Sequence, residues 1–244
     1  MNPAPVIFDC DGVLVDTHGH WDRAYTTLFT RYRARLHRDD RRRLVGLSLE
    51  RLGQALADLL GHPVSPGVLA QEIRELLATN TGADITPLPG AHELITALAD
   101  TRPLAITSNN PAEIVRDYLH ATGVPNVFDI IIGASDINHP KPAPDLYQHT
   151  CRQLGVPCTS VIVLEDSFIG VQSALAAGTT VFAIPTLPQT RPLAHRSFPS
   201  LIDPTLWNAL DLTTATGAIP RPRRQRSAEP RPTRCGEGPG CSGG

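Results

Sequence analysis

Short runs of apolar and β-branched residues recur along the chain, and each is followed by a turn signal and then by a helical pattern. The runs that predict strands cover residues 5–8, 103–107, 128–132, 160–164 and 179–184. The segments that predict helices between them cover residues 91–99, 111–121, 144–154 and 167–177. Near-continuous β-branched runs that alternate with helices are typical of a parallel sheet that is buried on both faces. The pattern therefore predicts an α/β core with a doubly wound parallel sheet.

The interval between the first and second predicted strands has a different pattern. Apolar residues recur at helical spacing over residues 20–36, 49–60 and 66–79, and no strand-like run interrupts them. Helices inserted directly after one strand predict a small α-helical cap, and the Pro-Leu-Pro-Gly segment at 87–90 marks the return to the core. We therefore predict a core over residues 1–16 and 88–190, a cap over 17–87 and a C-terminal extension of the core over 191–212.

The last segment, residues 213–244, is expected to be a disordered basic tail. It contains six arginines against two glutamates, is rich in proline and glycine, and has few apolar side chains. Burial in such a segment cannot offset the conformational entropy lost on ordering. Nucleic-acid binding is not favoured, because the arginines lack interleaved aromatic residues and a folded motif.

The overall composition, with 41% hydrophobic and 19% charged residues, is typical of a folded soluble protein. No apolar run is long enough for a membrane span, and the N-terminus does not resemble a secretory signal, so we expect a cytoplasmic location. The five cysteines lack zinc-site spacing and are expected to be reduced thiols. The sequence leaves the oligomeric state open.

Acidic residues follow two of the predicted strands. Asp9 and Asp11 come directly after the first strand, and Glu165 and Asp166 come after the fourth. The carboxyl ends of parallel strands lie on one edge of a sheet, so these carboxylates are expected to converge. Carboxylates brought together repel one another unless a cation lies among them, and oxygen ligands of this kind suit Mg²⁺. The sequence therefore predicts a magnesium site at this edge.

One basic residue differs from all the others. Of the 22 basic residues 21 are arginine, and Lys141 is the single lysine. A lone lysine in an arginine-rich chain indicates a position that requires a compact ammonium rather than a planar guanidinium. A metal ion and an ammonium together predict a site that binds and activates a dianionic group. Taken singly, however, Asp11-Gly12 is also typical of a turn and Asp166-Ser167 of a helix N-cap.

Four segments in chain order resemble the four motifs of the haloacid dehalogenase-like hydrolases. The segments are Phe8-Asp9-Cys10-Asp11-Gly12-Val13-Leu14-Val15-Asp16-Thr17, Ser108-Asn109, Lys141-Pro142-Ala143-Pro144-Asp145, and Leu164-Glu165-Asp166-Ser167 with Gly170. The resemblance covers residues 5 to 185. The helical insert after the first motif is similar to the cap of phosphoglycolate phosphatase-like enzymes and β-phosphoglucomutases.

The resemblance implies a role for each motif residue. Asp9 would attack phosphorus and form an aspartyl-phosphate, while Asp11 would protonate the leaving oxygen and offer its backbone carbonyl to the metal ion. Ser108 and the Asn109 amide would hold a phosphoryl oxygen. Lys141 would neutralise charge between Asp9 and the phosphoryl group.

The fourth motif would complete the metal site. Asp166 would bind Mg²⁺ directly, and Glu165 would lie close by and act directly or through water. The implied activity is a Mg²⁺-dependent phosphatase that acts on a small phosphorylated metabolite of the sugar phosphate or phosphoglycolate type. Phosphoryl transfer requires mainly positioning and charge neutralisation, which this small set of residues can supply.

Other activities of the family are less compatible with the sequence. Dehalogenases lack the second aspartate, and phosphonatases require a cap lysine, which this chain does not have. The main alternative is a β-phosphoglucomutase-like phosphomutase. Those enzymes carry a histidine where this chain has Trp21 and an arginine where it has Leu49, although Arg51 could substitute for the latter. The departures favour hydrolysis.

Two cap residues are candidates for substrate contact. Gly46, in Gly46-Leu47-Ser48, resembles the specificity loop of the mutases, and His20 lies where the chain leaves the core for the cap. A structural role for His20 is an equally open interpretation. A non-catalytic interaction module is a second alternative for the whole chain. It is disfavoured because Asp9, Asp11 and Asp166 are all present.

Overall fold

The computed structural model describes residues 3–62, 64–79, 85–185 and 194–212. Its main element is a six-stranded sheet in the order β5-β4-β1-β6-β7-β8, and every neighbouring pair is parallel. The strands are β1 (Val6–Phe8), β4 (Leu104–Thr107), β5 (Ile130–Ile132), β6 (Ile162–Glu165), β7 (Thr180–Ala183) and β8 (Arg196–Ser197). The predicted parallel sheet is therefore confirmed.

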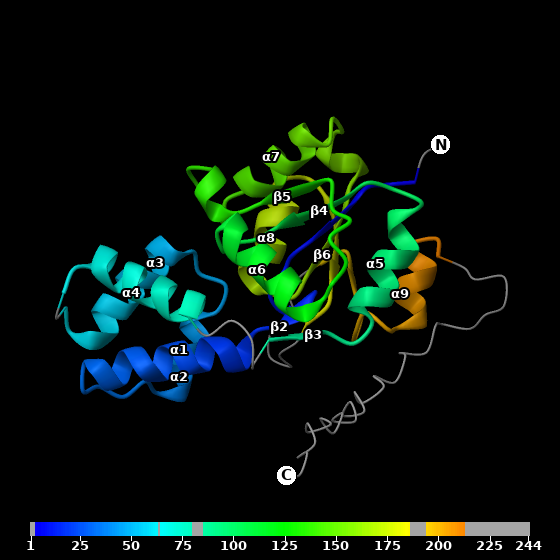
Figure 1. The fold of residues 1–244 in the computed structure, drawn as a ribbon. Helices are drawn as coiled ribbons and strands as arrows, with labels where there is room; N and C mark the ends of the chain where they lie inside the picture. Colours follow the sequence, from blue (N-terminus) through cyan, green and yellow to red (C-terminus); the bar gives the residue numbers. More distant parts are fainter. Residues whose placement is uncertain (1–2, 63, 80–84, 186–193, 213–244) are drawn as a thin grey trace, which may run out of the picture.

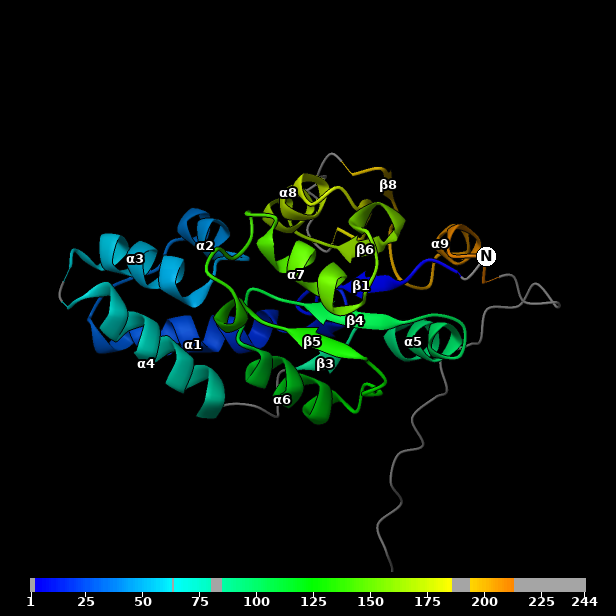
Figure 2. The ribbon, with the colours of Figure 1, turned by 90° about the horizontal axis from the view of Figure 1, so that it is seen from above.

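Helices cover both faces of this sheet, as Figure 2 shows for α7 and α8 on one side and α6 on the other. Alternate residues of β1 belong to different cores: Val6 and Phe8 pack with α5 and α6, whereas Ile7 packs with α7 and α8. Strand residues point alternately to the two faces, so this division is the signature of a doubly wound sheet. The core helices are α5 (Ala91–Ala99), α6 (Ala112–Thr122), α7 (Asp145–Gln153) and α8 (Phe168–Ala176), with 3-10 turns η1 (Ala134–Asp136) and η2 (Cys158–Ser160).

A helical insert, here called the cap, lies to one side of the sheet (Figure 1). It consists of α1 (His18–Arg31), α2 (Arg38–Leu44), α3 (Leu49–Leu60) and α4 (Pro66–Thr79), and it has an apolar core of its own. The two-residue strands β2 (Val15–Asp16) and β3 (Thr86–Pro87) pair antiparallel where the chain leaves the core and returns to it. This small sheet was not predicted from the sequence.

The first cap helix is shorter than predicted. It ends at Arg31, because Arg33 has a left-handed φ of 52° and the Ala34 N–H turns back to the Phe29 carbonyl. A separate helix, α2, follows and carries Arg41, which forms an ion pair with Asp22 of α1. Arg41 therefore joins two cap helices.

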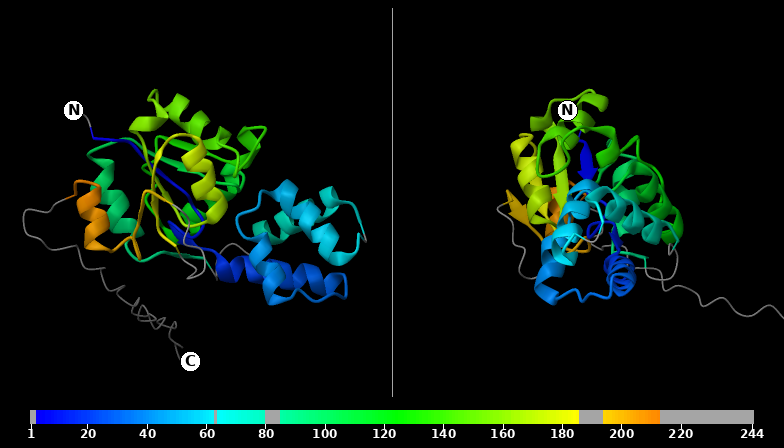
Figure 3. Two further views of the ribbon diagram at one scale, coloured as in Figure 1. Left: turned by 180° about the vertical axis from the view of Figure 1, so that it is seen from behind. Right: turned by 90° about the vertical axis from the view of Figure 1, so that its left-hand side faces the viewer.

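The C-terminal part of the described chain packs on the core. Phe198, Leu206 and Trp207 are buried in the same apolar cluster as α5, and α9 (Pro204–Ala209) lies beside that helix (Figures 1 and 3). The predicted basic tail at 213–244 lies outside the described residues. Cys10, Cys151 and Cys158 are free thiols. Within the described residues, no helix combines the length and the apolarity that a membrane span requires.

Candidate active site

Three adjacent strands carry the predicted motif residues at their carboxyl ends. Asp9 follows β1, Ser108 follows β4, and Glu165 is the last residue of β6. The backbone N–H of Asp9 donates to the Leu164 carbonyl at 2.9 Å, which extends the sheet pairing up to the site. The parallel topology thus brings residues from distant parts of the sequence to one edge, where open α/β folds bind ligands.

The Lys141 ammonium lies at the centre of this edge. Its Nζ donates to Asp9 Oδ1 at 2.7 Å, to Glu165 Oε1 at 2.6 Å and to the Thr107 carbonyl at 2.8 Å. These three bonds use all three ammonium hydrogens, and the side chain is only 2% exposed. Lys141 therefore connects the ends of β1, β4 and β6 in a buried, charge-assisted network.

The charges in this network shift one another's pKa. Burial raises the pKa of Asp9 to about 8; the Lys141 ammonium opposes this shift, and the carboxylates of Glu165 and Asp11 add to it. Burial alone would lower the pKa of Lys141, but Asp9 and Glu165 together raise it well above its ordinary value. The ammonium is therefore held in its charged form, while burial disfavours the ionised form of Asp9.

Glu165 is fully buried and makes contacts that the sequence did not predict. Its Oε1 also accepts from the Tyr147 hydroxyl at 2.7 Å, and its Oε2 accepts from the backbone N–H groups of Asp166 and Ser167 at 3.1 and 3.3 Å. Gly170 makes room for this carboxylate, because a Cβ there would lie 1.8 Å from Oε1. Glu165 thus fixes both Lys141 and the loop that carries Asp166.

Asp9, Glu165 and Asp166 each offer a carboxylate oxygen, and these oxygens lie within 4.8 Å of one another. Such a set of hard oxygen donors fits Mg²⁺. Because Lys141 and backbone N–H groups already occupy the Glu165 oxygens, Asp9 and Asp166 fit best as direct ligands. Gly12 permits the close approach of the two loops, since a Cβ there would lie 2.1 Å from Asp166 Oδ2.

The Asp11 carboxylate accepts hydrogen bonds from three neutral donors. Thr17 Oγ1 and Trp21 Nε1 donate to Oδ1 at 2.7 and 3.4 Å, and Asn110 Nδ2 donates to Oδ2 at 2.9 Å. These donors come from the start of the cap, from α1 and from the loop after β4. Thr17 and Asn110 were not predicted as site residues, because short polar residues of this kind are equally typical of turns and caps.

Ser108 and Asn109 also lie at this edge. The Ser108 hydroxyl oxygen accepts from the Asn110 N–H at 3.0 Å, which leaves the hydroxyl hydrogen available to an anionic oxygen. The Asn109 side chain donates to the Gly46 carbonyl at 2.7 Å, so Gly46, between α2 and α3, lies next to the core loop. The structure thus places Gly46 beside the site.

For His20, the structure does not match the expected contact with substrate. Its side chain is fully buried and packs edge-to-face against Tyr118 of α6, with ring centroids 5.7 Å apart. The arrangement favours the structural interpretation, in which His20 joins the cap to the core.

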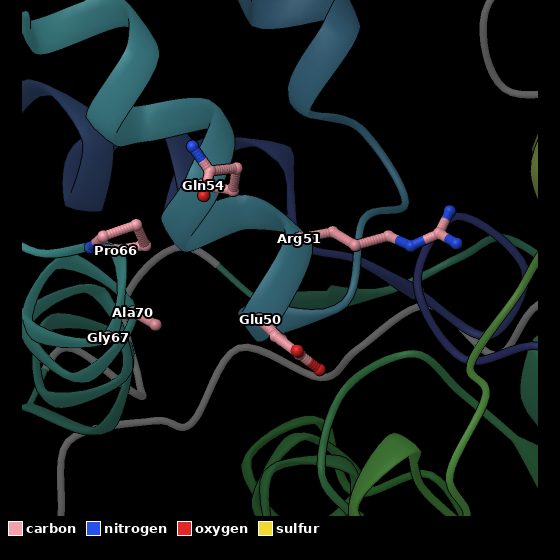
Figure 4. A pocket seen from close by; sticks show the side chains of 6 residues that line it. All are labelled: Glu50, Arg51, Gln54, Pro66, Gly67 and Ala70. Atoms are coloured by element: carbon pink, nitrogen blue, oxygen red, sulfur yellow. The ribbon is translucent and has the colours of Figure 1, made fainter.

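A separate pocket lies between α3 and α4 in the cap, and none of the motif residues line it. Figure 4 shows the Glu50 and Arg51 side chains extending away from α4. The lining residues are Glu50, Arg51, Gln54, Pro66, Gly67 and Ala70.

Known proteins are similar to this chain in sequence. The family model described as "Haloacid dehalogenase-like hydrolase" matches residues 6–184. Fructose-1-phosphate phosphatase YqaB of Escherichia coli (strain K12) is 29% identical over 72% of this chain and 93% of its own length. 6-Phosphogluconate phosphatase of the same organism is 28% identical over 84% of this chain and 94% of its own.

Solved structures give the same result. The structure of CbbY from Rhodobacter sphaeroides in complex with xylulose-(1,5)bisphosphate has a TM-score of 0.70 and 25% sequence identity, covering 82% of this chain and 95% of that one. The family model spans all four motifs, and the fold places them at one edge of the sheet. The chain belongs to the haloacid dehalogenase-like hydrolases.

Proposed function

We propose that the protein is a Mg²⁺-dependent phosphatase that hydrolyses a small phosphorylated metabolite through an aspartyl-phosphate on Asp9. The observation that carries this proposal is that the Asp9 carboxylate accepts from the Lys141 ammonium at 2.7 Å and also lies within 4.8 Å of a carboxylate oxygen of Asp166. Mg²⁺ held by Asp9 and Asp166 would supply positive charge that neutralises the phosphoryl oxygens.

The residues divide the reaction into two displacements. A carboxylate oxygen of Asp9 forms a bond to phosphorus as the bond to the substrate oxygen breaks, and Asp11 gives that oxygen a proton. Water then attacks phosphorus, gives its proton to Asp11, and releases inorganic phosphate and free Asp9. Throughout, the Ser108 hydroxyl and the backbone N–H of Asn109 bind phosphoryl oxygens.

The relatives support a sugar phosphate as substrate. Two of them are named for fructose 1-phosphate and for 6-phosphogluconate, and the chain covers more than nine-tenths of each. Both named substrates are phosphomonoesters of a polyhydroxy carbon chain. We therefore assign this chain to the same substrate class, with phosphoglycolate as the smaller candidate.

Trp21 supports hydrolysis over phosphomutase activity. It stands where the mutases carry a histidine, and its indole N–H donates to Asp11 Oδ1 at 3.4 Å. An indole N–H is a donor only and does not titrate, so it cannot change the charge beside Asp11 as a histidine can.

A screen of phosphorylated metabolites with Mg²⁺, which follows phosphate release, tests the proposal. We expect turnover of at least one hexose phosphate or sugar acid phosphate, its loss in Asp9→Asn, and an unchanged fold by circular dichroism. Metal-dependent turnover by Asp9→Asn would contradict the mechanism. Glucose 1-phosphate supplied with a bisphosphate primer tests the mutase: conversion without free phosphate would establish that activity instead.

A further inference from the structure

The side-chain amide of Asn109 joins the cap to the backbone of the site lysine. Its Oδ1 accepts from the Lys141 N–H at 2.9 Å, and its Nδ2 donates to the Lys141 carbonyl at 3.2 Å. The same Nδ2 donates to the carbonyl of Gly46 in the cap at 2.7 Å. An asparagine amide has one acceptor oxygen and two N–H groups, so these three bonds use each of them.

The backbone at Gly46 also lies close to α8 of the core. Gly46 has a φ of 75°, and a Cβ at this position would lie 2.9 Å from Ile169 Cδ1 of α8. The loop between α2 and α3 therefore rests on the first turn of α8, which directly follows Asp166 and Ser167. The position of this loop determines whether the side-chain N–H of Asn109 can donate to the Gly46 carbonyl.

Loss of that acceptor would leave a nearly buried N–H unpaired. Asn109 is 7% exposed, and an unpaired buried donor costs more than the hydrogen bond itself contributes. As long as the shifted loop still excludes water, the amide can reduce this cost only by turning, and turning strains its two bonds to Lys141. Because the Asn109 amide is one rigid planar group, its contact with Gly46 and its contacts with Lys141 are energetically coupled.

We propose that Asn109 is a positioning residue that couples docking of the cap to the placement of Lys141. The inference rests on the proposed function, because Lys141 is its site lysine. The Asn109 backbone N–H, the proposed phosphoryl donor, is separate from this role and is retained in the alanine and aspartate variants used below. When the cap loop is docked, the amide holds the Lys141 backbone so that Nζ reaches Asp9 and Glu165.

The single lysine of the chain makes the coupling directly measurable. Protein labelled with ¹⁵N only in lysine gives one backbone amide signal, which belongs to Lys141. We expect Asn109→Ala to shift this signal upfield and to speed its hydrogen exchange at least ~tenfold, because the amide loses its acceptor. If that variant does not fold, Asn109→Asp keeps an acceptor for the Lys141 N–H but loses the donor to Gly46, so the signal should stay near its wild-type position and no longer respond to Gly46→Ala.

Gly46→Ala tests the cap side of the link. The added methyl group would lie 2.9 Å from Ile169 Cδ1, and the φ of 75° disfavours any side chain, so we expect the loop to shift and the Lys141 signal to move in the same direction, but less far. The double variant should match Asn109→Ala alone, because the link is already broken. Glu113→Gln is the control: it removes the exposed cap–core ion pair between Arg74 and Glu113 and should leave the signal in place.

Turnover gives a second measurement. Asn109→Ala should lower kcat by roughly tenfold to a hundredfold and change KM less, since a misplaced ammonium affects the reacting group more than substrate binding. The coupling would be overturned if Gly46→Ala left the Lys141 signal unchanged. It would also be overturned if the signal shifts of the two single variants added up in the double variant. The signal needs no turnover, so it remains decisive if the proposed phosphatase activity itself fails.

Discussion

The Lys141 ammonium lies 2.6 Å from Glu165 Oε1, and both side chains are almost completely withdrawn from solvent. A buried pair of this kind gains little net stability over a pair of apolar residues, but the loss of one partner leaves an uncompensated charge. Glu165 is further tied to Tyr147 and to the loop that carries Asp166. This carboxylate therefore serves the site by holding its parts together.

Glu165→Gln should destabilise the fold by about 3 kcal/mol, because it removes the buried countercharge and turns an N–H₂ group toward groups that donate. Urea unfolding measures this change in the free energy of unfolding. Glu113→Gln is the matched control on an exposed ion pair and should cost less than about 1 kcal/mol. Equal effects of the two substitutions would show that Glu165 has no special structural role.

The sheet and the motif residues could be predicted because both leave a local pattern. The β-branched runs mark the strands, and the order of the motifs on successive strand ends places Asp9, Ser108 and Asp166 together. The strands β2 and β8 are only two residues long, too short to show any periodicity.

Contacts that depend on three-dimensional packing leave no local pattern in the sequence. Tyr147 is an apolar-face residue of a helix, and its hydrogen bond to Glu165 follows only from how α7 packs on the sheet. In α1, Trp21 contacts Asp11, whereas His20, one residue earlier, packs on Tyr118. Successive helix residues point about 100° apart, so sequence proximity alone did not identify the residue that faces the site.

The raised pKa of Asp9 predicts a pH-dependent stability in metal-free protein. Its ordinary pKa is 3.8 and its folded pKa is about 8. Between these values the folded protein keeps a proton that the unfolded chain has lost, so this group's contribution to stability falls as pH rises and levels off above pH 8. The Asp9→Asn variant has no carboxyl group at this position and does not lose stability in this way. In EDTA, near pH 8, its free energy of unfolding should therefore exceed that of wild type by at least ~1 kcal/mol.

Urea unfolding at several pH values between the two pKa values measures this difference. Adding Mg²⁺ should stabilise wild type more than Asp9→Asn, because the cation favours the ionised carboxylate. A difference between the two proteins that does not change with pH would show that Asp9 has an ordinary pKa.

Asp166→Asn should weaken Mg²⁺ binding by at least ~tenfold, because it removes one of the two carboxylates that we propose as direct ligands. We expect chelator-treated wild type to be inactive and to recover with Mg²⁺, whereas the variant requires far higher metal concentrations. Calorimetric titration with Mg²⁺ measures the affinity without a substrate. Asp58→Asn, a change to an exposed carboxylate of the cap that lies 3.2 Å from His62, is the control and should bind Mg²⁺ like wild type.

Gly12→Ala should impair metal binding through steric displacement. The new Cβ would overlap the Asp166 carboxylate, 2.1 Å from Oδ2, and the backbone φ of 80° adds strain of about 1 kcal/mol. Relaxation moves Asp166 away from Asp9, so Mg²⁺ affinity should fall by at least ~tenfold. Gly123→Ala has a similar φ of 65° but nothing within 4 Å of the added methyl group, so it carries the strain without the displacement. We expect it to lower stability by a similar backbone cost and to bind Mg²⁺ normally; equal loss of affinity in both variants would attribute the effect to backbone strain rather than to Asp166.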